Sequence, residues 1–478
     1  MSVPGRPILK RKSQTPEDDR EFRIDLYDVL LPCRQFLLVH KVAEVGAVSL
    51  VTEFLLRLIH AMDSVDESAA AAFFGFDTRE MNFALADLES KSYVDRHDGV
   101  LSLTHAGRAL FQYGQETPQI YTVQKRAMTQ GFDLLSFAPQ DNVRVERFES
   151  RLDELPIDAE RVSTASREIR TAFRNFFGEI STRTDKDVVK HLSLYSIDNV
   201  IAERRFSAPI SFYLKARTSR PGAAEADLSE WRTPQQIDDR TRIVESIAAH
   251  IEKLKAQSRP DDKKGYSLLS HFGGNFFKDF MRQDELAVER YFSSALTRAG
   301  ELRVDRPTVP IVGTFFVEEN TARLTEALQY GKRALGQNAS IPGLCWLIPD
   351  TNWGHTHVLP TVLGALAGSL APSPDSGFQT AGLAKQSLRP HQKEAFSVSE
   401  VAVNGTEIPA SLELLWIPGV LAAALVHAPV KTRSGIPIPL GFLSFNSQVI
   451  ARVEEFLKSK FSLANALANA AGPNTGSH

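Results

Sequence analysis

Cysteine is nearly absent from this chain: its 478 residues include only Cys33 and Cys345. Two cysteines so far apart in sequence provide neither a disulfide framework nor a zinc site of their own, and they favour a reducing compartment. The longest apolar stretch, residues 412–430, is broken by two prolines, a glycine and a histidine, so it does not predict a membrane span. The first residues lack the apolar core of a secretory signal. We therefore expect a cytoplasmic protein that makes no membrane contact.

Several nucleotide-binding and hydrolase motifs are also missing. The chain has no G-x-x-x-x-G-K-[ST] phosphate loop, no G-x-G-x-x-G fingerprint and no G-x-S-x-G elbow. These absences disfavour ATP, NAD and serine-hydrolase chemistry, and we expect no cofactor. Neither sign of charge is in excess, since 55 Lys and Arg against 58 Asp and Glu give a net charge of -3. Any contact with nucleic acid must then come from a local patch.

The composition is that of an ordinary globular protein, with 43% hydrophobic and 24% charged residues. A chain of this length predicts about three domains. The fold class that we predict is α/β and multidomain, ending in a domain whose sheet contains a βαβ unit. The predicted divisions are a disordered basic and acidic tail at 1–21, a strand pair and helical domain at 22–115, an α+β middle domain at 116–300, an α/β domain at 301–465 and a disordered tail at 466–478.

Residues 48–111 carry the clearest local pattern. Apolar residues recur at helical spacing from Leu50, and SVDESAAAAFFGF predicts a short second helix capped by Ser64. DTREMNFALADLESKSYV predicts a third helix that starts at Asp77 or Thr78. A hairpin follows, with its turn at Asp98 and Gly99. The predicted order is therefore three helices and then a β-hairpin.

The end of this segment reads Leu103-Thr-His-Ala-Gly-Arg108. A Leu-Thr-x-x-Gly-Arg phrase after a hairpin resembles prokaryotic members of the winged helix-turn-helix superfamily. The resemblance covers about 65 residues of this chain. It implies a winged-helix fold, in which the third helix enters the major groove of DNA and the hairpin contacts the backbone.

The charge of the same segment complicates DNA binding. Arg79 and Asn82 on the third helix are the candidate base contacts. Residues 48–111 nevertheless hold five Lys or Arg against ten Asp or Glu, a formal charge of -5. Because phosphate contacts dominate nucleic-acid affinity, two interpretations stay open. The segment contacts DNA with help from the N-terminal arm or another domain, or it binds a protein partner or itself.

A second candidate nucleic-acid surface combines basic residues with Phe206, Phe212 and Tyr213. Basic side chains beside aromatic rings suit single-stranded nucleic acid, because they bind phosphates while the rings stack on bases. The alternative is a solvated basic face above an aromatic core. The basic candidates are Arg204, Arg205, Lys215, Arg217 and Arg220.

Two stretches faintly resemble the H-x-K-x-x-x-x-D motif of the phospholipase D superfamily, which implies a histidine nucleophile. In the first, His191 and Asp198 match, and Ser193 replaces the lysine. In the second, His427 precedes a Gly-x-x-Ser-Phe-Asn phrase, but proline and serine stand at the lysine and aspartate positions. Losing both lysines removes the charge that would stabilise a phosphorane-like state. A degenerate relative is therefore favoured over an active enzyme.

The last third of the chain predicts a βαβ unit, with buried strands at 309–317 and 343–348 around a helix at 321–335. Asp350, His355 and His357 follow the second strand, where α/β folds place their sites. They could ligate a divalent metal if further ligands converge, or they form an ordinary hydrogen-bonded loop.

No intact catalytic set accompanies the helical segment and the basic-aromatic stretch. We therefore expect a bacterial, non-catalytic component of a DNA-processing or phage-defence system that binds nucleic acid or a protein partner. The alternatives are a degenerate phospholipase D-like nuclease or metal-dependent hydrolase, and a pure protein scaffold.

Overall fold

A computed structural model of the chain describes a mixed α/β protein with two compact units. One unit comprises residues 1–33, 142–158 and 206–478, and the other comprises residues 34–141 and 159–205. We call them the first and second unit. The described residues are 19–45, 50–111, 116–118, 121–184, 192–229, 231, 240–282, 285–297, 301–336, 341–371, 377–403, 405–430 and 432–471.

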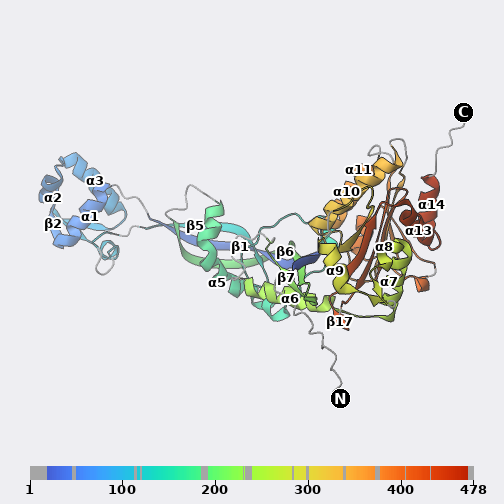
Figure 1. Cartoon of the computed structure of the whole chain (residues 1–478). Helices are drawn as coiled ribbons and strands as arrows, with labels where there is room; N and C mark the ends of the chain where they lie inside the picture. Colours follow the sequence, from blue (N-terminus) through green and yellow to red (C-terminus); the bar gives the residue numbers. More distant parts are fainter. Residues whose placement is uncertain are drawn as a thin grey trace, which may run out of the picture. The chain divides into compact units, whose positions relative to one another are not determined.

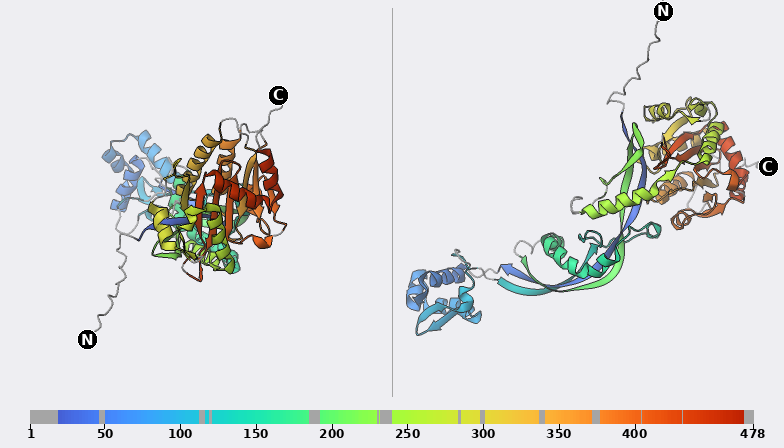
Figure 2. Two further views of the ribbon diagram at one scale, coloured as in Figure 1. Left: turned by 45° about the vertical axis from the view of Figure 1, so that its right-hand side comes forward. Right: turned by 90° about the horizontal axis from the view of Figure 1, so that it is seen from below.

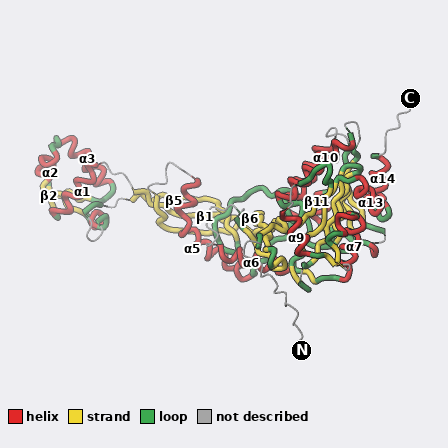
Figure 3. Tube along the Cα trace, viewed as in Figure 1, coloured by secondary structure: helices red, strands yellow, loops and turns green. Residues whose placement is uncertain are grey.

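Within the second unit, residues 50–111 form a small helical segment around a three-stranded antiparallel sheet of order β2-β4-β3 (Figure 3). The three helices and the hairpin occur in the order that the sequence predicts. The elements are α1 (Leu50–Met62), β2 (Ser64–Asp66), α2 (Glu67–Phe74), α3 (Thr78–Ser90), β3 (Val94–His97), β4 (Val100–Leu103) and α4 (His105–Arg108).

Helix caps explain where these helices start. Asp66, and not the predicted Ser64, caps α2 by accepting from the backbone of Ser68 and Ala69, because Ser64 is already paired in β2. Asp77 caps α3 and forms a reciprocal capping box with Glu80. Each such cap stabilises a helix by about 1 kcal/mol.

Two residues of the Leu-Thr-x-x-Gly-Arg phrase at residues 103–108, Thr104 and Gly107, make contacts that explain their identity. Thr104 caps α4 by accepting from the backbone N–H of Gly107 at 3.0 Å, and its hydroxyl donates to the carbonyl of Ser92 at 2.6 Å. A Cβ on Gly107 would lie 2.0 Å from the carbonyl oxygen of Tyr93. Only glycine allows this close backbone approach. A buried core joins the helices to the sheet through Leu55, Leu56, Ile59, Met81, Leu85, Leu88 and Leu101.

A four-stranded sheet has the order β5-β1-β6-β7. Its strands β1 (Glu21–Val45) and β6 (Leu192–Arg217) run side by side (Figure 2). β6 is one continuous strand over this whole range. The sheet is completed by β5 (Tyr121–Asp133) and β7 (Arg220–Asp227), and α5 (Ala159–Thr184) follows β5 along the chain.

The first unit is built on a seven-stranded sheet of order β11-β18-β16-β15-β12-β13-β14. Its strands are β11 (Thr308–Val312), β12 (Gly343–Ile348), β13 (Gln379–Ala384), β14 (Val398–Val401), β15 (Leu412–Ile417), β16 (Leu421–Ala428) and β18 (Ile438–Ser444). Nearly every residue of the five central strands is buried, as expected for a sheet covered on both faces.

The predicted pairing of β11 with β12 is wrong. β11 pairs with β18, and three strands separate it from β12, although the two strands point the same way. The parallel neighbours are β12 and β13, joined through α11 (Val358–Leu370). The sheet therefore contains a βαβ unit one element later than predicted, because the later strands β15, β16 and β18 insert between β11 and β12.

Helices cover both faces of this sheet. α10 (Glu318–Leu335) and α11 lie on one side, and α7 (Pro260–Gly273), α13 (Ser447–Lys458) and α14 (Ser462–Ala470) lie on the other (Figure 1). Pro260 opens α7, a position that suits proline. α14 extends beyond residue 466 because Ala464 and Leu467 are buried.

The remaining elements of the first unit are short or peripheral. Among the described residues, no helix combines the length and the apolar character needed to cross a membrane. These elements are α6 (Thr241–Leu254), β8 (Ala256–Gln257), α8 (Asn275–Lys278), β9 (Met281–Arg282), β10 (Glu285–Leu286), α9 (Val288–Thr297), α12 (Pro390–Ala395) and β17 (Ser434–Gly435).

Candidate functional sites

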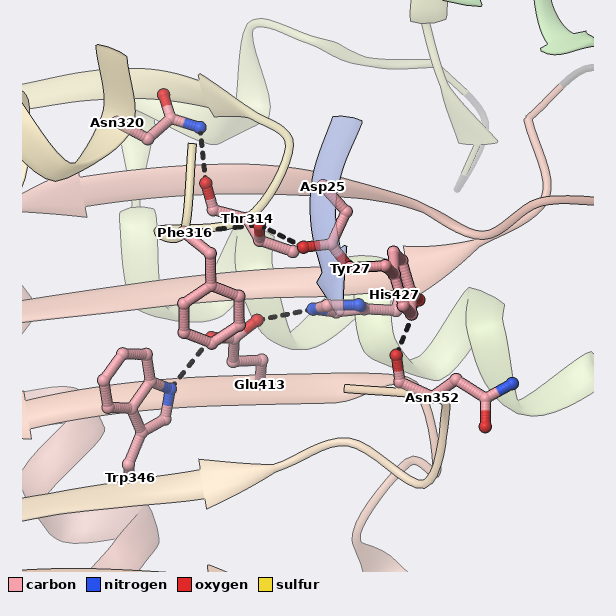
Figure 4. Close-up of polar contacts among 9 residues, drawn as sticks. All are labelled: Asp25, Tyr27, Thr314, Phe316, Asn320, Trp346, Asn352, Glu413 and His427. Carbon is pink, nitrogen blue, oxygen red and sulfur yellow. Dashed lines mark hydrogen bonds and ion pairs between the residues drawn. The ribbon is translucent and has the colours of Figure 1, made fainter. Parts of the chain in front are cut away.

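A buried polar cluster lies on the α10–α11 side of the seven-stranded sheet (Figure 4). Glu413 of β15 and His427 of β16 point toward each other, with 2.5 Å between Glu413 Oε2 and His427 Nε2. The indole N–H of Trp346 donates to Glu413 Oε1 at 2.8 Å. In the register of the two strands Glu413 faces Leu425, so His427 is its diagonal neighbour on the same face.

Asp25 of β1 adds a second buried carboxyl to this cluster. It accepts from Thr314 Oγ1 at 2.7 Å and from the backbone N–H of Leu26 at 2.9 Å. Burial raises the pKa of Asp25 to about 8, and the nearby charge of Glu413 acts in the same direction. Asp25 is therefore mostly protonated at neutral pH. Asn320 holds the turn that carries Thr314 by donating to its carbonyl at 2.9 Å.

The loops after β12 and β13 extend the cluster. The hydroxyl of Tyr27 donates to the carbonyl of Asn352 at 2.7 Å. Arg389 Nη1 donates to Asn352 Oδ1 at 2.6 Å and to His355 Nε2 at 2.9 Å. Burial lowers the pKa of His355 to about 2 and that of His391 to about 4. Both imidazoles are therefore neutral, which allows His355 to accept from the guanidinium.

The predicted metal ligands have separate environments. His355 is held by Arg389, whereas His357 Nδ1 lies 2.7 Å from Asp28 Oδ2 and Asp350 is exposed. The hydrogen bond to Asp28 raises the pKa of His357. Within the described ranges, no group of three or more His, Cys, Asp or Glu side chains is arranged to hold a metal ion.

The phospholipase D-like candidates fall in different units. His427 belongs to the first unit, and Asp198 of β6 belongs to the second, where it lies 3.8 Å from Lys41 Nζ. His191 is outside the described residues. The side chains of Glu413 and His427 are 1% and 5% exposed. A substrate could reach this pair only if the residues that cover it were displaced.

On the helical segment, most described cations are paired with acids. Arg96 of β3 makes a two-point contact with Glu67 and donates to Asn82 Oδ1 at 3.1 Å. Lys91 pairs with Asp87 at 3.0 Å. Asn82, a predicted base contact, thus already has its amide oxygen engaged, while Arg79 is exposed.

An apolar groove opens on the same segment between α1 and α3. Its volume is about 940 Å³. Phe83 of α3 is 84% exposed, which is unusual for a phenylalanine in the middle of a helix. The lining includes Val51, Phe76, Phe83 and Ala84, with Glu80 and Asp87 among its charged members.

The basic-aromatic stretch is divided between the units. Arg204 and Arg205 belong to the second unit, and Lys215, Arg217 and Arg220 belong to the first. Lys215 pairs with Asp227 and Arg217 lies 3.7 Å from Asp19. Arg204 donates to Gln35, while Arg205 and Arg220 are exposed.

The aromatic rings of this stretch are poorly placed for stacking. Residues 208–216 alternate between buried and half-buried, and Phe212 is fully buried. The guanidinium of Arg23 covers the ring of Tyr213 at 4.1 Å. Phe212 is therefore a core residue and is not available to a nucleic-acid base.

Sequence reasoning missed most members of the buried cluster. Glu413 lies inside LELLWI, where a carboxylate in an otherwise apolar strand was the available signal. Asp25, Tyr27, Arg389 and His391 come from distant positions, and only the fold brings them together. Comparison with protein-family models, curated proteins and solved structures produced no match for this chain.

Proposed function

We propose that this chain is a non-catalytic binding component of a multi-protein DNA-processing or phage-defence assembly. In this proposal residues 50–111 are a winged helix that docks a protein partner. The order of helices and hairpin and the roles of Thr104 and Gly107 support the winged-helix assignment. The observation that carries the docking role is Phe83, which stands 84% exposed on the helix that would otherwise enter DNA.

Electrostatics favour a protein over a DNA groove. The segment has a formal charge of -5 between residues 48 and 111, and the pairs Arg96–Glu67 and Lys91–Asp87 neutralise two of its cations. The acidic side chains of this surface would repel the phosphates of DNA, because DNA binding depends on cations that neutralise those phosphates. A basic amphipathic helix fits better, because apolar side chains would fill the groove beside Phe83 while Lys or Arg met the exposed carboxylate of Glu80.

A charge-swapped pair of peptides tests this function. We would label two designed amphipathic helices with the same apolar face, one carrying lysine and the other glutamate, and titrate each with the full chain by fluorescence anisotropy. The expected result is binding of the lysine peptide, weakened by salt, with little binding of the glutamate peptide. Duplex DNA serves as a third probe. Tight, salt-dependent DNA binding with no preference between the peptides would overturn the docking role.

A divergent phosphodiesterase is the second candidate, favoured by the 2.5 Å contact of His427 with Glu413. A carboxylate orients histidine in many catalytic sites. A nuclease and phosphodiesterase assay of the purified chain beside His427→Gln tests this candidate. Activity that disappears in the variant would support an enzyme, whereas equal absence in both proteins would leave the cluster as a structural element.

A further inference from the structure

A polar cavity of about 700 Å³ lies beside α7, α8 and the start of α13 in the first unit. Its volume is within the range of small-molecule sites, about 300–1,000 Å³. Thr308, the first residue of β11, and Asn446, two residues beyond β18, place it at one end of the seven-stranded sheet. His427 pairs with Pro439 toward the opposite end of β18. The cavity is therefore separate from the buried polar cluster.

The lining of this cavity is suited to an anion. His271, Lys278 and Arg452 supply basic groups, and no Asp or Glu occurs among the lining residues that the structure describes. Hydroxyl and amide groups complete the wall, including those of Ser267, Ser270, Asn275 and Gln448. Several cations and neutral donors without a counter-charge are the surroundings that a phosphate group requires.

Arg452 is fixed in position by the end of α7. Its Nη1 donates to the carbonyl of Phe272 at 3.2 Å. Gly274 has a φ of +58°, and a Cβ there would lie 2.8 Å from the same Nη1. Glycine thus permits the close approach of the guanidinium. Both hydrogen bonds of Arg452 are made by Nη1. Its Nη2 and Nε have no hydrogen-bond partner among the described residues. These two nitrogens are therefore available to a ligand.

A second cavity of about 380 Å³ adjoins the first and shares Phe276 and Thr308 with it. Phe280 and Arg290 also line it, with the guanidinium 5.8 Å from the centre of the Phe280 ring. The wall of this second cavity carries Asp279 as well as Arg290 and Arg306, and Arg306 is already paired with Glu301. The first cavity has no acidic residue among the lining residues that the structure describes, so we place the phosphates in the first cavity. The half-buried ring of Phe276 offers a face for a planar group.

From these two adjoining cavities we propose a binding site for a nucleoside phosphate. The phosphates lie near His271, Lys278 and Arg452, and the base lies against Phe276. No phosphate-loop motif is present, and the proposed contacts come from side chains that line the cavity. The residues of this site belong to the first unit, whereas those of the proposed docking groove belong to the second.

Calorimetric titration of the full chain with ADP, pyrophosphate and adenosine tests the site. We expect ADP to bind more tightly than pyrophosphate, and adenosine to bind weakly. The double variant His271→Gln with Lys278→Gln should bind ADP at least about ten-fold more weakly, which corresponds to about 1.4 kcal/mol. Both side chains are exposed, so the fold should persist. Lys253→Gln, an exposed lysine on α6, is the matched control and should bind as the parent chain does.

The variant Phe276→Leu tests binding of the base separately from binding of the phosphates. It keeps an apolar side chain but removes the aromatic face, so ADP binding should weaken while pyrophosphate binding is unchanged. Equal ADP affinity in the double variant and the parent chain would overturn the site. Equal affinity for ADP and pyrophosphate, unaffected by Phe276→Leu, would overturn the nucleoside assignment. A single-stranded oligonucleotide that binds here and is not displaced by ADP would also contradict it.

Discussion

Glu413 and His427 lie on adjacent antiparallel strands, and 2.5 Å separates Glu413 Oε2 from His427 Nε2 in an almost completely buried pair. Trp346 donates to the other carboxylate oxygen. Burying a carboxylate is costly unless its oxygens are satisfied. Both oxygens of the Glu413 carboxylate therefore have partners, and we expect this pair to contribute to the stability of the first unit.

Replacing Glu413 by Gln should destabilise the first unit strongly. The variant replaces the carboxylate that contacts His427 and weakens the acceptor of the Trp346 N–H, and a buried polar group left poorly satisfied typically costs about 1–3 kcal/mol. Urea unfolding followed by tryptophan fluorescence measures the loss. The double variant Glu413→Leu with His427→Leu should be less destabilised than either single leucine variant. A Glu413→Gln variant with the same free energy of unfolding as the parent chain would show that the Glu413–His427 pair does not contribute to stability.

Asp25 should make the protein less stable as the pH rises from about 4 to about 8, between its unfolded and folded pKa values. Burial raises its pKa to about 8, far above the value of 3.8 for an exposed carboxyl. The folded chain then holds a proton that the unfolded chain releases, so stability from this group falls as the pH passes through the folded pKa, by up to about 1.4 kcal/mol per pH unit. Asp25→Asn should flatten the decline in urea midpoint between pH 6.5 and 8. An identical decline in the variant would contradict the assignment.

His355 should act in the opposite direction at lower pH. Burial lowers its pKa to about 2, below the ordinary 6.5, so the unfolded chain takes up a proton that the folded chain does not. Stability from this group is present above pH 6.5 and is lost as the pH falls. His355→Asn should therefore show a smaller fall in Tm between pH 7 and 5 than the parent chain. The variant can be less stable at pH 7, because Arg389 loses a partner, without affecting this comparison of slopes.

Gly107→Ala should disrupt the helical segment. The added methyl group would lie 2.0 Å from the carbonyl oxygen of Tyr93, and backbone cannot yield as a flexible side chain would. We expect a loss of at least about 2 kcal/mol, as for other overpacked sites, and faster limited proteolysis within residues 50–111. Gly178→Ala in α5 is the control, because nothing lies within 4 Å of its added Cβ. Alanine there should be neutral or stabilising. Equal proteolysis of Gly107→Ala and the parent chain would contradict the close approach.

The local structure was predictable where short-range chemistry determines it. The cap of α3 is Asp77, one of the two residues at which the sequence predicts that this helix starts, and the buried strand Gly343–Ile348 has the predicted bounds. The sequence-based predictions were wrong where strand pairing and strand order depend on segments that are far apart in the chain. Residues 220–227 have weak strand propensity, yet they pair with Tyr213–Arg217 of β6. Strand order likewise depends on β15, β16 and β18, which follow β11 by a hundred residues or more.

The candidate sites also contain contacts between residues that are far apart in the sequence, and the sequence alone could not predict these contacts. His355, His357 and His427 stood out as polar residues in or after apolar strands, but their partners Arg389, Asp28 and Glu413 could not be paired with them from spacing alone. The sequence gives no signal that singles out Phe83 among the apolar residues of α3. Only its exposure in the structure distinguishes it from the buried Met81, Leu85 and Leu88 of the same helix.

The most direct test of the docking role compares two exposed phenylalanines of the same segment. Phe83 lines the groove, whereas Phe73 of α2, 72% exposed, is not among its lining residues. Phe83→Ser and Phe73→Ser remove the same group, and anisotropy titration with the lysine-bearing amphipathic peptide measures each. We predict that Phe83→Ser weakens binding at least about ten-fold, equivalent to about 1.4 kcal/mol, while Phe73→Ser leaves it unchanged. Equal affinities in all three proteins, or an equal loss in both variants, would contradict the account.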